Sequence, residues 1–312
     1  TSCHKESKSL KSISYNIGAA TVARVAVNGI GLIVVGILSR TLGTEGFGDY
    51  NAVFAYLFLF NALADMGLYT LLVRDVSRLN ASEQHIVGNL FTLRLAIVLG
   101  CIVIADILVW VLPFAPIIKL GIVVGSASIV CSSLVQVLLG VFQKYLKLYV
   151  VSITDVVTRV IQLGGVLALL VHGNHQVLWY IWVVVLAEAV HVLLVIFFAR
   201  RLVPFTLQFD TEYWRSTMIQ AFPIAISLVF VLLYFKIDTV MLSLMRSSHE
   251  VGMYSVAYKV LEVIIFFPAM YIGLVMPMLS RDAGDPVAFR AVYRKTFRFL
   301  LVTAIPAVVS TA

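Results

Sequence analysis

The sequence has few charged residues, few cysteines and none of the short motifs of the common enzyme classes. Of its 312 residues only 12% are charged, whereas a soluble domain has about 25%. This charge is too low to cover a water-soluble globule, which argues against a cytosolic enzyme and a disordered chain. The three cysteines are an odd number and include no CxxC spacing, so neither a disulfide framework nor a zinc site is expected.

The missing motifs exclude several kinds of chemistry. The sequence contains no Walker motif, HExxH, GxSxG or glycine-rich dinucleotide loop. A membrane-embedded glycosyl- or phosphotransferase would need clustered carboxylates to hold a divalent metal and a diphosphate. The region 65–75 has two aspartates, but their spacing fits no such motif. We therefore expect no enzyme, no cofactor and no metal site.

Long apolar runs make up most of what is present. Hydrophobic residues account for 61% of the chain, and the mean hydropathy is +1.00. A helix needs about 20 apolar residues to cross a bilayer, and the runs are continuous, which favours helices over alternating β-strands. The sequence therefore predicts an all-α integral membrane protein, a transmembrane helix bundle of about nine spans: 14–38, 47–73, 89–112, 116–139, 150–171, 177–199, 218–242, 251–279 and 292–312.

Basic residues alternate between the two sets of connecting loops. One set carries Lys5, Lys8, Lys11, Arg74, Arg78, Lys144, Lys147, Arg200, Arg201, Arg215, Arg281 and Arg290, and the other carries Arg40 and Arg246. Because lysine and arginine concentrate in cytoplasmic loops, we expect a cytoplasmic N-terminus and a multi-pass protein of the inner or plasma membrane. The net charge of +7 is explained by these loops, and no nucleic-acid partner is expected.

The sequence also indicates an internal repeat. A shift of 204 residues lays the first three predicted spans over the last three, with Gly48 on Gly252 and Tyr50 on Tyr254. Parallel repeats are typical of transporters whose two lobes move around a central site. We expect two parallel six-helix lobes in the full protein. Because the chain ends at Ala312 within an apolar run, we expect the second lobe to be truncated here.

This repeat predicts the domain organisation. The expected parts are a cytoplasmic N-terminal segment at 1–13, a first six-helix lobe at 14–199, a cytoplasmic linker at 200–217, and the first three helices of the second lobe at 218–312. The linker has mixed charge, Pro204 and the aromatic pair Tyr213 and Trp214. An amphipathic helix on the membrane surface is expected there.

Two stretches resemble a known family. The run LSRTLGTEGFGDY at 38–50 resembles the R-x-LG-x-x-x-FG-x-Y signature of Wzx-type polysaccharide flippases, which belong to the multidrug/oligosaccharidyl-lipid/polysaccharide exporter superfamily. The runs FKIDTVML at 235–242 and EVGMYSVAY at 250–258 are similar to the seventh and eighth helices of that family. The resemblance covers most of the chain.

The resemblance implies a substrate and a mode of action. It implies alternating access that moves a lipid-linked oligosaccharide, usually on a polyprenyl diphosphate, from the cytoplasmic to the outer leaflet for surface polysaccharide biosynthesis. The implied partners are this substrate, membrane lipid and other polysaccharide-assembly proteins. Two lobes in one chain would make a monomer sufficient.

Ionisable side chains within the spans are costly in a bilayer, so each is a candidate functional residue. Arg24 lies about 15 Å into the first span at 1.5 Å per residue, with Asn28 on the same helix face. A guanidinium can bind a diphosphate through two parallel hydrogen bonds. We expect Arg24 and Asn28 to contact substrate; the alternative for Arg24 is a structural ion pair.

The fifth and sixth spans carry two further charged groups of residues. Asp155 and Arg159 have the spacing of an intrahelical ion pair; alternatively, Arg159 binds substrate while Asp155 modulates its charge. Glu188 and His191 are three residues apart, and this pair either carries a proton or takes part in a hydrogen bond between helices.

The second lobe adds one basic and one acidic candidate residue. Lys236 either binds substrate near the outer mouth or extends to the membrane interface, and Glu262 is spaced to pair with Lys259. Asp155, Glu188 and Glu262 are thus candidates for ion coupling or structural pairing. Arg94, Asp106 and Lys119 lie near span ends, where an interfacial position is expected.

A multidrug/cation antiporter of the same superfamily is the alternative function. Such an antiporter would be expected to have acidic residues in its cavity, whereas the first span contains a base and no acid. This favours an anionic substrate. The acids Asp155, Glu188 and Glu262 keep the alternative open.

Overall fold

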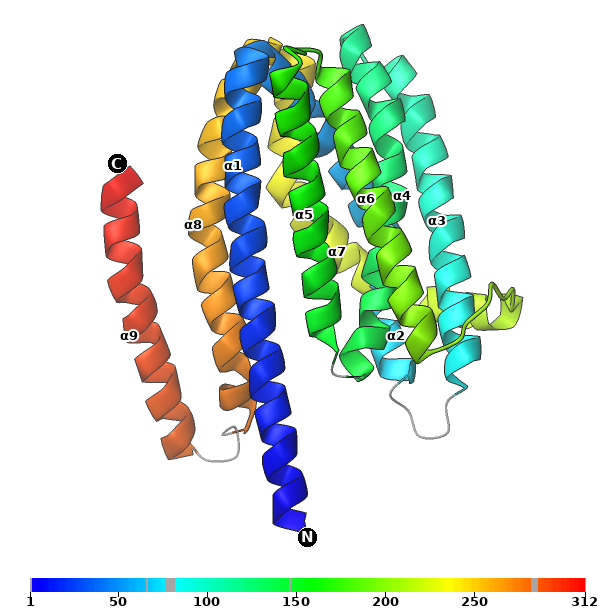
Figure 1. Cartoon of the computed structure of the whole chain (residues 1–312), viewed down its shortest axis with the longest axis vertical. Helices are drawn as coiled ribbons and strands as arrows, with labels where there is room; N and C mark the ends of the chain where they lie inside the picture. The colour runs from blue at the N-terminus through cyan, green and yellow to red at the C-terminus, as the bar shows by residue number, and fades with distance from the viewer. Residues whose placement is uncertain (1, 66, 77–81, 146, 282–285, 312) are drawn as a thin grey trace. The chain divides into compact units, whose positions relative to one another are not determined.

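The chain is an all-α membrane protein. The computed structural model describes residues 2–65, 67–76, 82–145, 147–281 and 286–311, with side chains described from residue 23 onward at most positions. These residues form nine helices and no strand (Figure 1). The helices are α1 (Ser2–Asp65), α2 (Leu68–Val76), α3 (Glu83–Val111), α4 (Pro116–Lys144), α5 (Leu148–Val171), α6 (Val177–Leu202), α7 (Thr211–Met245), α8 (Ser248–Arg281) and α9 (Pro286–Thr311).

Five helical segments are long and apolar enough to cross a membrane: 23–65, 83–111, 116–144, 148–171 and 177–202. The last four agree closely with the predicted spans 89–112, 116–139, 150–171 and 177–199. The residues of these segments that face outward are large and apolar, including Ile107, Trp110 and Leu193. A hydrophobic outer surface of this kind is stable only in lipid, so the protein is a multi-pass membrane protein.

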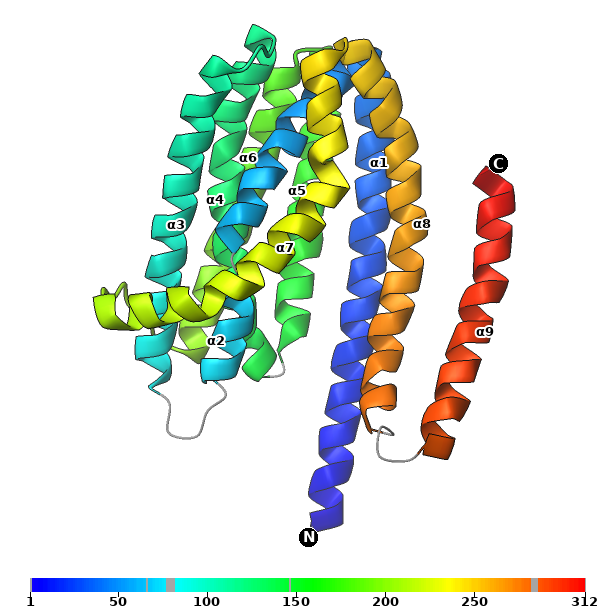
Figure 2. The same ribbon diagram turned by 180° about the vertical axis from the view of Figure 1, so that it is seen from behind.

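The first two predicted spans form one helix that changes direction. Within α1, Gly43 has φ 66° and ψ −177°, a backbone conformation that glycine adopts without steric cost. Figures 1 and 2 show α1 reaching one end of the bundle and turning back there. The predicted span 47–73 is not continuous, because α1 ends at Asp65, Gly67 has a positive φ of 69°, and α2 begins at Leu68.

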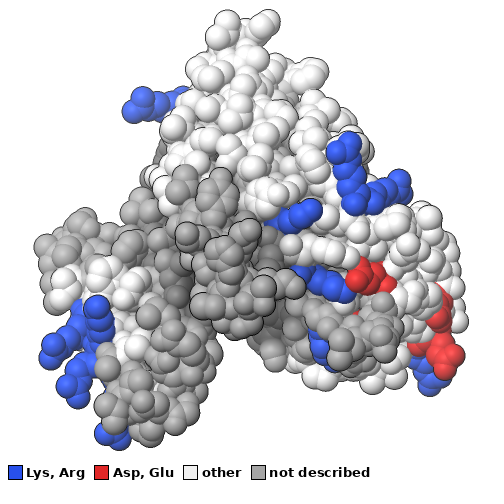
Figure 3. Space-filling model, turned by 60° about the horizontal axis from the view of Figure 1, so that its bottom comes forward, with Lys and Arg blue, Asp and Glu red and all other residues white. Residues whose placement is uncertain are grey.

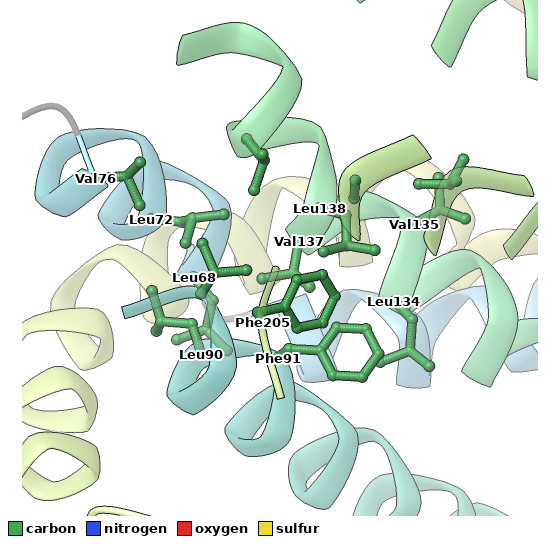
Figure 4. Packing of buried hydrophobic residues seen from close by; sticks show 14 of the residues in the cluster. Leu68, Leu72, Val76, Leu90, Phe91, Leu134, Val135, Val137, Leu138 and Phe205 are labelled. Carbon is green, nitrogen blue, oxygen red and sulfur yellow. The ribbon is translucent and has the colours of Figure 1, made fainter. Parts of the chain in front are cut away.

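Three buried clusters hold this part of the chain together. The smallest packs the first half of α1 against α5 and α6, through residues such as Val34, Val166 and Tyr180, and the other two are larger. One joins α2, α3 and α4 with the segment after α6, through residues such as Leu72, Leu90, Phe91, Leu138 and Phe205 (Figure 4). The rings of Phe91 and Phe205 lie 5.3 Å apart. The other cluster packs the returning half of α1 against α3 and α4. These contacts fix the helices that carry the charged residues described below.

The linker 200–217 is irregular only in its middle part. Helix α6 continues to Leu202, residues 203–210 are irregular, and the rest of the linker forms the first turns of α7. The Asp210 carboxylate caps α7 by accepting hydrogen bonds from the backbone amides of Glu212 and Tyr213, at 3.1 and 3.0 Å, which stabilises a helix start. Figure 2 shows this first part of α7 lying across the ends of α2 and α3.

The basic residues of one set of loops gather at one end of these helices. Arg74 lies in the last turn of α2, Lys144 in that of α4, and Arg200 and Arg201 in that of α6. Figure 3 looks onto this end and shows lysine and arginine side chains around it. The alternation seen in the sequence therefore corresponds to a spatial separation. The assignment of this end to the cytoplasm remains a prediction from the positive-inside rule.

The chain divides into two compact units, residues 1–252 and 253–312. The first contains α1 to α7 and the start of α8. In the second, the rings of Tyr271 and Phe299 stack with their centroids 4.3 Å apart.

Candidate functional site

The first element of the site is the guanidinium of Arg24 on α1. Arg24 and Asn28 are both exposed and lie one turn apart, which places them on one face of the helix. Arg24 makes no hydrogen bond or ion pair with any described residue. A charged group in an apolar segment needs a compensating partner or water, so this guanidinium is available to an anionic ligand.

The second element is Arg159 on α5, which packs beside α1. Arg159 is half-buried, and its Nη1 donates a hydrogen bond of 2.7 Å to Oε1 of Gln162. The expected ion pair with Asp155 is absent among the described residues, although the four-residue spacing would permit it. Gln162 is a neutral partner, so it orients the guanidinium without cancelling its charge.

The third element is the histidine that Asp155 contacts in place of Arg159. His191 on α6 is 4% exposed and lies between two carboxylates. Its Nε2 is 3.4 Å from Oδ1 of Asp155, and its Nδ1 is 3.5 Å from Oε2 of Glu188. The predicted Glu188–His191 proximity is therefore present, and Asp155 joins it from the neighbouring helix.

These elements form one electrostatic group, called here the Arg24–Arg159 site. The guanidinium groups of Arg24 and Arg159 both lie within electrostatic range of the Asp155 carboxylate, and the hydroxyl of Tyr50 lies within range of Arg159. Because the carboxylate sits against His191, it compensates the two cations only in part. The arrangement can bind an anion with two charge-assisted contacts.

The candidates of the second lobe have different environments. The side chain of Lys236 lies outside the described residues. Glu262 forms the expected pair with Lys259, with Nζ and Oε2 2.7 Å apart. Among the described residues, no group of three or more His, Cys, Asp and Glu side chains is placed to hold a metal ion.

An apolar groove of about 650 Å³ lies between α5 and α6. It is lined by Gly165, Ala168, Leu169, His172, Trp179, Trp182, Val183 and Leu186.

Arg94 is a buried structural residue, and the expectation of an interfacial position was wrong. The residue is 0% exposed. Nη1 lies 3.1 Å from Oδ1 of Asp65 and also donates to the Ala64 carbonyl oxygen, while Nη2 donates to Gln136 at 3.0 Å. The ion pair joins α3 to α1, and the hydrogen bond to Gln136 joins α3 to α4. Arg94 therefore has a structural role.

Sequence reasoning missed Gln162 and Gln136 as arginine partners. The position of Gln162, three residues after Arg159, is a helical spacing that could have indicated its role. Gln136 comes from a different helix than Arg94, and no spacing along the chain connects them.

Comparisons with known proteins identify the family and the fold of the chain. A family model described as polysaccharide biosynthesis protein matches residues 13–282. A solved structure of the MATE multidrug transporter DinF-BH, determined as a complex with a ligand, is similar in fold. Its TM-score is 0.63 at 15% identity, over 95% of this chain and 71% of that one. No curated protein sequence matches the chain.

Proposed function

The chain belongs to the polysaccharide biosynthesis protein family, and we propose that it moves a lipid-linked oligosaccharide from the cytoplasmic to the outer leaflet of the plasma membrane. The family match and the shared fold confirm the resemblance to the exporter superfamily noted in the sequence. They identify the chain as a membrane transporter rather than an enzyme.

The observation that carries the substrate proposal is that Arg24 makes no hydrogen bond or ion pair with any residue whose side chain the structure describes. A polyprenyl diphosphate has a dense negative charge on a neutral lipid, and a guanidinium grips such a group through parallel hydrogen bonds. Arg24, Asn28 and Arg159 would contact the diphosphate, and Lys236 would add a cation from the second lobe. The three acids Asp155, Glu188 and Glu262 would either pair with these basic residues or couple transport to an ion.

The proposed cycle is alternating access between two lobes, at 14–199 and from 218 onward, joined by the linker 200–217. Both lobes belong to one chain, so a monomer suffices in this cycle. Other polysaccharide-assembly proteins would supply and consume the substrate.

A cation antiporter is the second candidate, because the solved neighbour is a multidrug transporter and the site contains carboxylates. One assay separates the two functions. Liposomes with the purified protein are loaded either with a polyprenyl-diphosphate oligosaccharide or with a cationic dye. The proposal predicts movement of the lipid-linked sugar to the opposite leaflet and no protein-dependent dye transport. Dye expulsion without movement of the lipid-linked sugar would establish the antiporter instead.

A further inference from the structure

His191 lies between two carboxylates, an arrangement that suits an imidazole ring with two N–H groups. A neutral imidazole has one N–H donor and one acceptor nitrogen, whereas the imidazolium has two donors. His191 has a carboxylate oxygen at 3.4 Å from Nε2 and another at 3.5 Å from Nδ1. In a neutral ring, one nitrogen lone pair would face a carboxylate. Nε2 is buried and makes no hydrogen bond with a described residue, so its contact with Asp155 is electrostatic.

Among the described side chains, few other charges face His191. Helix α6 packs against α4, α5 and α1. In their central parts α5 contributes Asp155 and Arg159, α1 contributes Arg24, and α6 itself contributes Glu188. The titratable group of α4 there is the thiol of Cys131, which lies within electrostatic range of Glu188. With a neutral ring the two arginines and two acids cancel, and with a protonated ring the group has a net charge of about +1.

The position of Asp155 determines how this charge is distributed. Its carboxylate lies at His191, yet Arg159 is one helical turn away at the usual spacing for an ion pair. Arg159 instead bonds the neutral Gln162 at 2.7 Å. If the ring lost its proton, the carboxylate would lose its attractive partner, and the nearest remaining cations would be Arg159 and Arg24.

We propose that His191 is a proton-binding residue that sets the anion affinity of the Arg24–Arg159 site. The protonated ring holds Asp155 and leaves both guanidinium groups free for a diphosphate. The neutral ring releases Asp155, which then neutralises the arginines and competes with the ligand. Proton and anion binding therefore favour one another, and thermodynamic linkage requires the effect to be mutual. This inference rests on the proposed anionic substrate.

The test is binding of inorganic diphosphate to the purified protein in lipid nanodiscs, measured by calorimetry between pH 5.5 and pH 8. The ligand titrates in this range, so the quantity compared is the ratio of wild-type to variant affinity at each pH. His191→Gln should bind on the order of tenfold more weakly than wild type at low pH, a typical coupling magnitude, and about equally at high pH. His191→Arg should bind tightly across the range. The control, His172→Gln, alters an exposed histidine outside the site and should follow wild type.

A second measurement uses the wild-type protein, so it does not depend on the folding of a variant. Nitrogen-15 NMR of labelled histidine should show diphosphate converting His191 toward the imidazolium form at a fixed pH near 7. A wild-type to His191→Gln ratio that stays constant with pH, together with an unchanged NMR signal, would overturn this inference while leaving the proposed function intact. Absence of diphosphate binding at every pH would count against the anionic site itself, and with it both proposals.

Discussion

Gly48 and Gly252 meet where α1 crosses the start of α8, and each glycine contacts the other's helix in the same way. A β-carbon on Gly48 would overlap the carbonyl oxygen of Ser248 and lie 3.0 Å from the nitrogen of Gly252. A β-carbon on Gly252 would overlap the carbonyl oxygen of Thr44 and lie 3.3 Å from the nitrogen of Gly48. The same shift of 204 residues relates both pairs. Reciprocal contacts of this kind are produced by two-fold symmetry, which supports the predicted parallel repeat.

The close crossing predicts that neither glycine can be replaced by a larger residue without loss of stability. Gly48→Leu and Gly252→Leu should each destabilise the protein by about 1–3 kcal/mol or more, because the added atoms meet backbone that must move. Thermal unfolding of the purified protein measures the effect. Gly36→Leu is the matched control on α1, since a β-carbon there meets nothing within 4 Å. The double variant should lose less stability than the sum of the losses in the two single variants, because both changes disrupt one contact. Equal melting temperatures for Gly48→Leu and Gly36→Leu would refute the close crossing.

The buried ion pair of Arg94 and Asp65 predicts strong coupling between α3 and α1. Arg94→Met should destabilise the protein by less than the loss of about 3–5 kcal/mol for a fully buried pair, because it leaves the Asp65 carboxylate without its partner and the Asp65 side chain is 25% exposed. Adding Asp65→Leu should restore a large part of this loss. A double-mutant cycle by thermal unfolding measures the coupling, with Arg246→Met as the control. The side chain of Arg246 is 64% exposed and 3.7 Å from Glu250, so its loss should cost less than about 1 kcal/mol. Additive effects at Arg94 and Asp65 would contradict the pair.

Two adjacent glycines in α5 should respond differently to the same substitution. A β-carbon on Gly165 would lie 2.7 Å from Cγ1 of Val183 on α6, whereas one on Gly164 would meet nothing within 4 Å. Gly165→Leu should therefore lower the melting temperature, with a cost of about 1–3 kcal/mol from overpacking, and Gly164→Leu should leave it nearly unchanged. The reverse order of stabilities would show that α5 presents a different face to α6.

The two arginines of the site should contribute separately to anion binding. Arg24→Gln and Arg159→Gln should each weaken diphosphate binding about tenfold or more, since a hydrogen bond to a charged group contributes about 1.5–3 kcal/mol. Gln162→Leu should weaken it less, because it removes only the group that orients Arg159. Calorimetry in nanodiscs provides the measurement, with Arg40→Gln as a control outside the site. Unchanged binding in Arg159→Gln would remove that residue from the site.

The sequence predicted the helices better than their mutual contacts, for physical reasons. Apolar runs of sufficient length define spans on their own, so the bounds of α3 to α6 were nearly correct. The break at Gly67 was missed, because glycine is also tolerated within membrane helices and its left-handed backbone is not evident from composition.

Distances along one helix follow from spacing, whereas contacts between helices depend on how each helix is rotated. The spacing of Asp155 and Arg159 therefore predicted a pair that the structure replaces with contacts to His191 and Gln162. For the same reason the burial of Arg94 could not be anticipated, since its partners lie on other helices.

Transport by Arg24 variants shows whether this residue binds the diphosphate during translocation. Wild type, Arg24→Ala, Arg24→Lys and the control Arg40→Ala would be reconstituted at equal amounts, and the movement of a polyprenyl-diphosphate oligosaccharide between leaflets measured. The account predicts loss of transport in Arg24→Ala, partial activity in Arg24→Lys, which keeps the charge without the planar fork, and wild-type activity in Arg40→Ala. Full transport by Arg24→Ala would contradict a cationic diphosphate site at this residue.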